Sequence, residues 1–334
     1  MADSKLNGHR NTLKDVAAQA GVSVMSVSLA LRGGAASNRV SEQTRLRVLA
    51  AARELDYRPN ARARALRLQQ TDIIGFYAGH GYVNVRIPFF AEAVSGLQQG
   101  CEQVGKNLLL HSLSQTAGSD AVYRELMDGR VDGLVAAMPA TDALAARLAS
   151  VNVPIVAFAD AIAGVPSVVV DDARGAELIA EHIADLGHRR VVFAAGPILP
   201  FSGRRRQHTF LESAVSRGMD VIVRALGDDA SLADFVTAAR AERSTAIVAW
   251  NDFDARRILF AAQRLGLNVP GDLAITGFDG CPSPYNDPFP LTTIRLPWAE
   301  AASLAVIVLD RLIKHQPVDE FTTLPVSLLR GATT

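Results

Sequence analysis

From residue 72 onward, the chain alternates short apolar runs with longer stretches of helical periodicity. The apolar runs cover residues 73–77, 108–110, 134–137, 155–158, 191–195, 221–223, 247–250 and 274–278. Runs that are apolar throughout are typical of parallel strands buried on both faces and connected by helices. About 260 residues of this pattern exceed what one open sheet normally uses, so we predict an α/β body of two doubly wound parallel-sheet lobes. Ligands of such folds bind beyond the carboxyl ends of the strands.

The first 71 residues follow a different sequence pattern, with three short helical segments. Thr12 followed by Asp15 is typical of a helix start, and Gly21 of a helix end. Ser23 can cap a second helix that runs to about residue 32, and a third begins at residue 41. The apolar positions predicted to close a small core from the third helix are Leu46, Leu49, Ala52 and Leu55. The tight joint between the first two helices predicts a small all-α helix-turn-helix head over residues 12–57.

The second helix divides its side chains between two faces. The predicted core face carries Val27, Ala30 and Leu31, and the outer face carries Met25, Ser28 and Leu29. Apolar side chains on the outer face could meet thymine methyl groups in a DNA major groove. The alternative is an ordinary amphipathic helix with two exposed apolar residues.

The formal net charge of zero hides an asymmetry along the chain. Residues 1–70 hold 12 Lys and Arg against 5 Asp and Glu, whereas residues 71–334 hold 22 against 29. A basic head on an acidic body indicates an anionic partner such as nucleic acid. After residue 59, a stretch too short for a stable isolated helix carries Arg62, Arg64 and Arg67 for phosphates and Leu66 as a wedge between base steps. The alternative for this stretch is a solvated linker.

These motifs resemble the DNA-binding head and hinge of the lactose-repressor (LacI) family. The matching stretches are Thr12-Leu-Lys-Asp-Val-Ala-Ala-Gln-Ala-Gly-Val-Ser, Val27-Ser28, Tyr57-Arg-Pro-Asn and Arg64-Ala-Leu66-Arg67. The resemblance implies a homodimer with one head on each half of a pseudopalindromic double-stranded operator and the hinge leucine at its centre. The DNA-binding residues expected from the motifs and the resemblance are Thr12, Ser23, Val24, Met25, Ser28, Leu29, Asn60, Arg62, Arg64 and Leu66. Leu29 stands where an arginine is frequent in the family, which indicates reading through methyl groups and DNA shape.

Landmarks in the body resemble the effector domain of the same family, whose fold is similar to that of periplasmic sugar-binding proteins. They cover residues 171–176, 186–188, 206–210, 251–252, 266–272, 277–279 and 291–294. The resemblance implies a small-molecule effector between the lobes, with a sugar or sugar derivative as the first choice. The effector-binding residues expected are Phe89, Phe90, Asp160, Arg206, Trp250, Asn251 and Asp279. Arg206 could hold a carboxylate or two hydroxyls, one of the adjacent phenylalanines is alternatively helix core, and Asn251 and Asp279 alternatively cap loops.

Signatures of other protein classes are missing from the sequence. Cys101 and Cys281 lie far apart, which argues against a disulfide framework or a zinc site, and no P-loop, serine-hydrolase elbow or H-E-x-x-H sequence occurs. Gly79-His-Gly81 begins like a dinucleotide-binding loop, but Asn84 occupies the third glycine position. We therefore expect a transcriptional regulator, most simply a repressor, with no enzymatic activity, cofactor or metal. The polar N-terminal residues and the lack of an apolar run of about 18 residues predict a cytoplasmic chain without a membrane segment.

The expected organisation has four parts. A flexible tail covers residues 1–11, the helix-turn-helix domain 12–57, a hinge helix or linker 58–71, and an effector-binding and dimerisation body 72–334. No heptad tail follows the body, so a coiled-coil tetramer is not expected. The alternative function is a solute-binding protein that uses the body alone, which leaves the basic head without a role.

Overall fold

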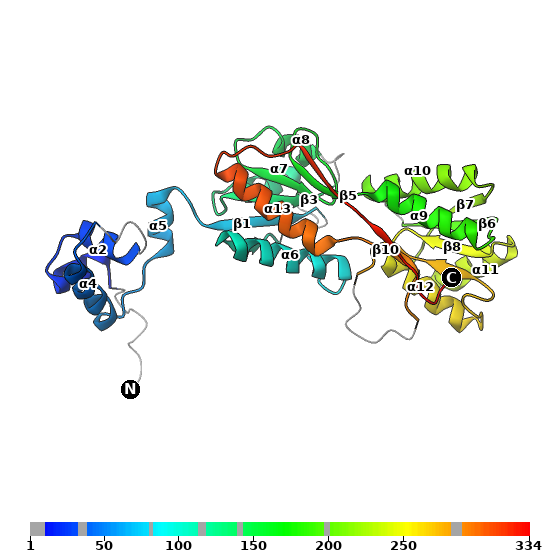
Figure 1. The fold of residues 1–334 in the computed structure, drawn as a ribbon, viewed down its shortest axis with the longest axis horizontal. Coiled ribbons are helices and arrows are strands. Elements are labelled where there is room, and N and C mark those ends of the chain that lie inside the picture. The colour runs from blue at the N-terminus through cyan, green and yellow to red at the C-terminus, as the bar shows by residue number, and fades with distance from the viewer. Residues whose placement is uncertain are drawn as a thin grey trace. The chain divides into compact units, whose positions relative to one another are not determined.

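In a computed structural model, the chain divides into two compact units, residues 1–71 and 72–334 (Figure 1). The structure describes residues 11–32, 39–79, 83–112, 118–138, 143–196, 201–281 and 289–334. Residues 1–10 of the expected tail, and His80 and Gly81 of the Gly-His-Gly loop, lie outside the described residues.

The N-terminal unit is built from short helices. α1 (Leu13–Ala20), α2 (Val24–Arg32) and α4 (Glu42–Glu54) enclose a core in which Val16, Val27 and Val48 are fully buried. Gly21 ends α1 with a φ of 61°, a left-handed conformation that glycine adopts without steric cost. With only residues 21–23 between α1 and α2, the predicted helix-turn-helix is confirmed.

The predicted starts of the first two helices are confirmed by their hydrogen bonds. At α1, the Thr12 backbone N donates to Asp15 Oδ2 at 2.7 Å. At α2, Ser23 Oγ accepts a hydrogen bond from Ser26 N at 3.1 Å. The Ser23 bond satisfies a backbone N–H that has no partner inside the first helical turn.

The core face predicted for α4 is wrong at Leu46. Leu46 is exposed, whereas Val48 and Ala51 are buried. The reason is that α4 turns the face with spacing 48, 51, 52 and 55 toward α1 and α2, and position 46 lies outside that face.

The segment after residue 59 forms helix α5 (Ala61–Leu68). Asn60 Oδ1 accepts a hydrogen bond from Ala63 N at 3.3 Å and so caps its first turn. The predicted helical stretch is therefore present, and its dependence on a partner for folding stays a prediction.

The first lobe of the body is a six-stranded parallel sheet in the order β11-β5-β4-β3-β1-β2. The strands are β1 (Ile73–Ala78), β2 (Asn107–Leu110), β3 (Gly133–Ala137), β4 (Ile155–Phe158), β5 (Ser167–Val170) and β11 (Phe321–Leu324). Helices α6 (Pro88–Val104) and α13 (Trp298–Ile313) cover one face, and α7 (Ser119–Leu126) and α8 (Ala143–Leu148) cover the other. Neighbouring residues such as Phe76 and Tyr77 belong to different cores, so both faces are buried as predicted.

The second lobe is a four-stranded parallel sheet in the order β7-β6-β8-β9. Its strands are β6 (Arg190–Ala195), β7 (Asp220–Ala225), β8 (Ala246–Ala249) and β9 (Ala274–Thr276). Helices α9 (Asp172–Asp185) and α10 (Phe201–Ser216) pack on one face, and α11 (Leu232–Ala241) and α12 (Asp252–Arg264) on the other. A short antiparallel pair, β10 (Thr293–Arg295) with β12 (Ser327–Leu329), completes this lobe. The two predicted parallel-sheet lobes are confirmed.

Within the described residues, the chain passes between the lobes at three places. These are residue 171 between β5 and α9, residues 296–297 between β10 and α13, and residues 325–326 between β11 and β12 (Figure 1). Connections this short form a natural hinge, because each lobe can turn as a rigid body while only a few backbone angles change.

Helices α6 and α13 pack closely because α6 carries glycine on the shared face. A Cβ added to Gly96 would lie 2.0 Å from the carbonyl oxygen of Ala299, and one added to Gly100 would lie 2.8 Å from that of Ser303. The close packing fixes the relative position of the two helix starts, which carry Phe89 and Trp298.

Candidate functional site

A cavity of about 430 Å³ lies between the lobes, where strands of both sheets end. The seven residues predicted to bind an effector all line it, namely Phe89, Phe90, Asp160, Arg206, Trp250, Asn251 and Asp279. The two phenylalanines begin α6, and Asp160 follows β4 of the first lobe. Arg206 lies on α10, and the remaining three follow β8 and β9 of the second lobe. The fold therefore brings distant segments together at the edge that the strand pattern indicated.

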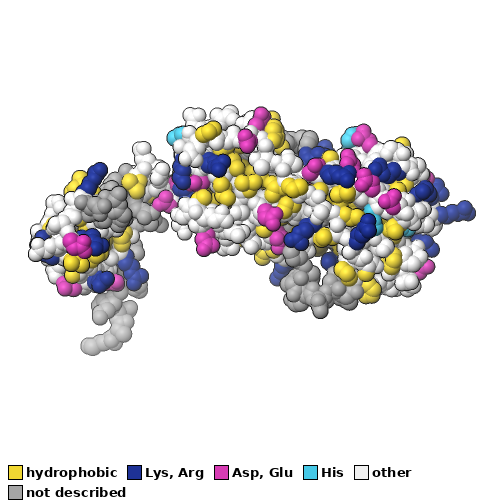
Figure 2. Space-filling model, in the orientation of Figure 1, with side chains coloured by type: hydrophobic (Ala, Val, Ile, Leu, Met, Phe, Trp, Pro, Cys, Tyr) yellow, Lys and Arg dark blue, Asp and Glu magenta, His cyan; other side chains and the backbone are white. Residues whose placement is uncertain are grey.

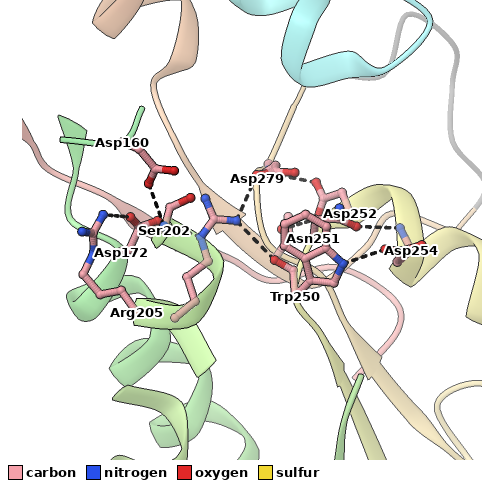
Figure 3. A network of polar contacts seen from close by, with 12 residues as sticks. Asp160, Asp172, Ser202, Arg205, Trp250, Asn251, Asp252, Asp254 and Asp279 are labelled. Carbon is pink, nitrogen blue, oxygen red and sulfur yellow. Dashed lines mark hydrogen bonds and ion pairs between the residues drawn. The ribbon is translucent and has the colours of Figure 1, made fainter. Parts of the chain in front are cut away.

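The Arg206 guanidinium is buried and already paired. Its Nε donates to Asp172 Oδ1 at 2.7 Å, and its Nη1 donates to Trp250 O at 3.2 Å and to Asp279 Oδ1 at 3.4 Å (Figure 3). The Arg206 Cζ lies 4.2 Å from the ring centroid of Phe278, a cation–π contact. Because the buried Asp172 side chain already pairs with it, Arg206 presents little net positive charge to the cavity.

Asp172 anchors this arginine from the start of α9. Its side chain is completely buried, and its second oxygen, Oδ2, accepts a hydrogen bond from Arg205 (Figure 3). The preceding residue, Asp171, caps α9 by accepting a hydrogen bond from Arg174 N at 2.9 Å. The N-terminal end of the helix dipole adds a favourable field for the Asp172 carboxylate.

Asp279 is a largely buried carboxyl group of the cavity with a raised pKa. Burial raises the pKa of its carboxyl group to about 7, while the Arg206 guanidinium lowers that pKa and the Asp252 carboxylate raises it. Its backbone has a φ of 152°, a conformation that residues other than glycine rarely adopt and that recurs at functional sites. Near pH 7, this carboxyl group can therefore either accept or donate a hydrogen bond.

Asp252 and Asn251 hold the loops at the second lobe's edge of the cavity. Asp252 accepts hydrogen bonds from Thr293 Oγ1 at 2.5 Å and from Gly280 N at 2.8 Å, and burial raises the pKa of this carboxyl. Asn251 Oδ1 accepts a hydrogen bond from Asp254 N at 2.7 Å and so caps α12. Asn251 therefore has the capping role that was its alternative interpretation, and it also lines the cavity.

The Trp250 side chain is fixed in the same region. Its indole Nε1 donates to Asp254 Oδ2 at 2.7 Å (Figure 3). Asp254 also pairs with Arg257 Nη1 at 2.6 Å. This chain of bonds orients the indole ring before any ligand enters.

A hydrogen bond joins the two lobes across the cavity. The Ser202 backbone N, in the first turn of α10, donates to Asp160 Oδ1 at 2.7 Å (Figure 3). Burial raises the pKa of Asp160, and the bond from Ser202 lowers it. Asp160 therefore contacts the other lobe directly and also lines the cavity.

Aromatic rings form the first lobe's side of the cavity. Phe89 stacks on Phe158 with centroids 6.1 Å apart and meets Trp298 edge to face at 4.9 Å. Phe90 lies in the buried core, as the alternative for one of the two phenylalanines stated, while Phe89 is half-buried. Flat apolar faces of this kind suit the C–H surfaces of a sugar ring.

The outer face of α2 exposes apolar side chains. Val24 is 42% exposed and Met25 67% exposed, while Leu29 is half-buried. The outward position predicted for Ser28 is wrong, because this short side chain is covered by its neighbours and is only 7% exposed. Thr12 and Ser23 are exposed where they begin α1 and α2. On the face of this unit seen in Figure 2, Lys and Arg side chains lie beside hydrophobic ones.

Among its described side chains, helix α5 exposes Leu66 most fully and Leu68 about half as much. Leu66 of α5 is 85% exposed. Asn60, predicted as a DNA contact, is exposed and caps the helix. The side chains of Arg62 and Arg64, also predicted DNA contacts, lie outside the described part of the chain.

Comparisons with known proteins match both units. The family model described as bacterial regulatory proteins, lacI family, matches residues 12–60, and the periplasmic binding protein-like domain matches residues 180–334. The ribose operon repressor of Bacillus subtilis is 30% identical over 97% of this chain and 98% of its own length. The chain belongs to the LacI family.

Further relatives of this LacI-family chain extend over its whole length. The lactose operon repressor of Escherichia coli is 29% identical over 97% of this chain and 90% of its own. A crystal structure of the lac repressor dimer bound to operator and an anti-inducer has a TM-score of 0.81 at 28% identity, covering 97% of this chain and 98% of that one. A complex of the transcriptional regulator CelR with cellobiose has a TM-score of 0.68 at 25% identity, covering 97% of this chain and all of that one.

The sequence of this LacI-family chain did not point to several cavity residues. Phe158, Asp172, Trp298 and Cys281 lie in or against the cavity. The sequence could have pointed to Asp172, because it is an acidic residue directly after the helix cap Asp171. Trp298 had none, because it enters the cavity through the packing of α13 on α6.

Among the residues that the structure describes, no helix combines the length and hydropathy that crossing a bilayer requires. The same residues include no group of three or more His, Cys, Asp or Glu side chains arranged to hold a metal ion.

Proposed function

We propose that this LacI-family transcription regulator is a homodimeric repressor whose affinity for operator DNA is set by a small molecule bound between the lobes. The observation that carries the proposal is the 430 Å³ cavity lined from both lobes by all seven expected residues. The head that matches the family over residues 12–60 disfavours the alternative of a solute-binding protein that uses the body alone. Because the target is chromosomal DNA, we place the protein in the cytoplasm. The relatives are repressors, and we propose no enzymatic activity.

The chemistry of the cavity favours an uncharged, hydroxyl-bearing effector, first a sugar. Arg206 is already paired with the buried Asp172, so a carboxylate ligand would gain little from it and would face the remaining acidic groups. Asp160 and Asp279 can accept hydrogen bonds from hydroxyls, while the Phe89 and Trp250 rings supply apolar surface. Of the two ligand groups that Arg206 could hold, a carboxylate or a pair of hydroxyls, the cavity therefore favours the hydroxyls. The sugars named for relatives, ribose, lactose and cellobiose, support the same class.

In the proposed mechanism, the effector changes how the lobes close. The Asp160 and Ser202 contact couples the ligand cavity to the lobe separation, and the short connections act as the hinge. An effector can shift DNA binding only through different affinities for the two lobe arrangements, and operator must change effector affinity by the same factor.

The α12 surface supports dimer formation by a second copy of this chain. Phe260 is 62% exposed and Phe253 nearly half exposed beside a groove of about 810 Å³ that Arg256 and Arg264 also line. Two exposed aromatic side chains two turns apart on one helix are typical of an interface. The lac repressor neighbour is named as a dimer, which supports the same assembly. Sedimentation of Phe260→Asp should show monomers, with Phe321→Asp, on exposed edge strand β11, as the dimeric control.

The decisive experiment is a mobility-shift assay of the full chain on the DNA upstream of its own gene. A specific complex that weakens with salt is expected, and its absence would refute the regulator function. Thermal-shift screening against neutral sugars, sugar acids and sugar phosphates then identifies the effector class. Arg206→Lys and Phe89→Ala should blunt the effector response while operator binding without effector persists. A normal dose response in both variants would remove the cavity from the mechanism.

A further inference from the structure

We propose that α2 reads its operator half-site through the C5-methyl groups of pyrimidines, with Met25 and Val24 as the specificity-determining side chains. This inference rests on the proposed function and names the DNA feature that the head recognises. The starting observation is that the two most exposed side chains at the start of α2, at 67% and 42%, are both apolar.

The polar groups of the same helix segment are already engaged. Ser23 Oγ accepts the Ser26 backbone N–H at 3.1 Å, and the two hydroxyls lie 2.9 Å apart in a hydrogen bond of their own. Ser28 is buried. Residues 24–31 contain no charged side chain and no amide side chain. The usual bidentate partners of guanine and adenine, Arg with Lys and Asn with Gln, are therefore missing from the reading face.

Affinity and sequence preference must then come from different parts of the head. Exposed cations outside this face, such as Lys14 and Arg47, suit phosphates, which give affinity without sequence information. The base-edge feature in the major groove that an apolar side chain can contact favourably is the methyl group of thymine. Met25 is long and flexible enough to follow it, and Leu29 lies one turn further along the same side of the helix.

The proposed contact depends on the methyl group itself and not on the base pair that carries it. Deoxyuridine, which lacks this methyl, should bind worse than thymidine at the contacted positions. 5-Methylcytosine carries the same methyl in the same groove, so it should bind better than cytosine there.

The test begins with duplexes selected from a random pool by the full chain. In the enriched site, each thymine is replaced singly by uracil and, in separate duplexes, by cytosine and by 5-methylcytosine, each paired with guanine. We expect a loss of about three- to fivefold in affinity at one or two thymines per half-site, the amount for one buried methyl group. The slope of affinity against salt should stay unchanged, because no phosphate contact is lost.

Matched variants assign the effect to the helix. Met25→Ala should bind the thymine and uracil duplexes with equal affinity at the affected position, because the side chain that senses the methyl is gone. Leu46→Ala, which shortens an exposed apolar side chain on α4, should keep the full thymine preference. An enriched site whose thymines all tolerate uracil would overturn the inference and leave the regulator function standing, as would a Met25→Ala variant with the original preference. Failure to enrich any sequence would overturn both.

Discussion

Asp172 and Arg206 form a buried ion pair in which Asp172 Oδ1 accepts a hydrogen bond from Arg206 Nε at 2.7 Å. The pair joins the start of α9 to α10, and through Arg206 it reaches Asp279 beyond β9. One fully buried carboxylate thus fixes the arginine at the centre of the proposed effector site.

Asp172→Ala should strongly destabilise the body, because it leaves Arg206 buried with only part of its charge compensated. Breaking a buried pair by removing one partner costs about 3–5 kcal/mol. Arg205→Ala is the control, since Arg205 contacts the same carboxylate but its side chain is 29% exposed, and such a pair contributes about 1 kcal/mol or less. Urea unfolding of each variant gives the two values, and equal losses would contradict the anchoring role.

Asp279→Asn should change how stability depends on pH. Because burial raises the pKa of Asp279 to about 7, the native state binds this proton more tightly than the unfolded state does. The original protein should therefore lose stability relative to Asp279→Asn as pH rises from about 4 to about 7, by up to about 1.4 kcal/mol per pH unit. Melting temperatures of both proteins across this range measure the difference. A difference that is flat with pH would show that Asp279 does not titrate there.

Leu66→Ala should weaken specific operator binding by about 1–3 kcal/mol and largely spare binding to random DNA. A wedge between base steps is compensated only on a site that bends. Leu68→Ala on the same helix is the control, because Leu68 is about half as exposed as Leu66. Equal losses on operator and random DNA, measured by mobility shift, would refute the wedge.

Gly96→Ala should destabilise the body by about 3 kcal/mol or more, because the new Cβ would lie 2.0 Å from the Ala299 carbonyl oxygen. The gain in helix propensity, about 1 kcal/mol, is too small to offset this clash. Gly118→Ala has open space around its Cβ and an ordinary φ of −62°, so its effect should stay within about 1 kcal/mol. Calorimetry of the two variants separates them, and a stable Gly96→Ala protein would mean that α6 and α13 can move apart.

Most of the parallel strands and the helix-turn-helix could be predicted because their signals are local. The buried strand β5 (Ser167–Val170) is an exception, since it was not among the predicted runs. Each of the eight apolar runs corresponds to a strand, and the caps at Thr12 and Ser23 begin helices where the sequence placed them. β11 (Phe321–Leu324) carried no such signal. Its residues alternate between exposed and half-buried positions at the edge of a sheet, so the strand has no apolar run to mark it.

The cavity was predictable only where its residues follow strands or match the family pattern. Asp160, Trp250 and Asp279 were placed by the strand ends they follow. Trp298 could not be found in this way, since its position depends on the contact between α6 and α13, which lie about two hundred residues apart in the chain. The outward position predicted for Ser28 on α2 was wrong for a related reason, because the size of the neighbouring side chains decides whether a short one is covered.

The first lobe is assembled from two separated stretches of chain, and this orders events during synthesis. Its sheet receives β11, and one face receives α13, only after every strand of the four-stranded sheet has left the ribosome. Until then, the glycine face of α6 and the face of β3 and β4 that α13 covers stay exposed. Nascent chains of this protein should therefore expose apolar surface on an incompletely folded first lobe through most of translation. We expect them to bind chaperones until residues 298–324 emerge.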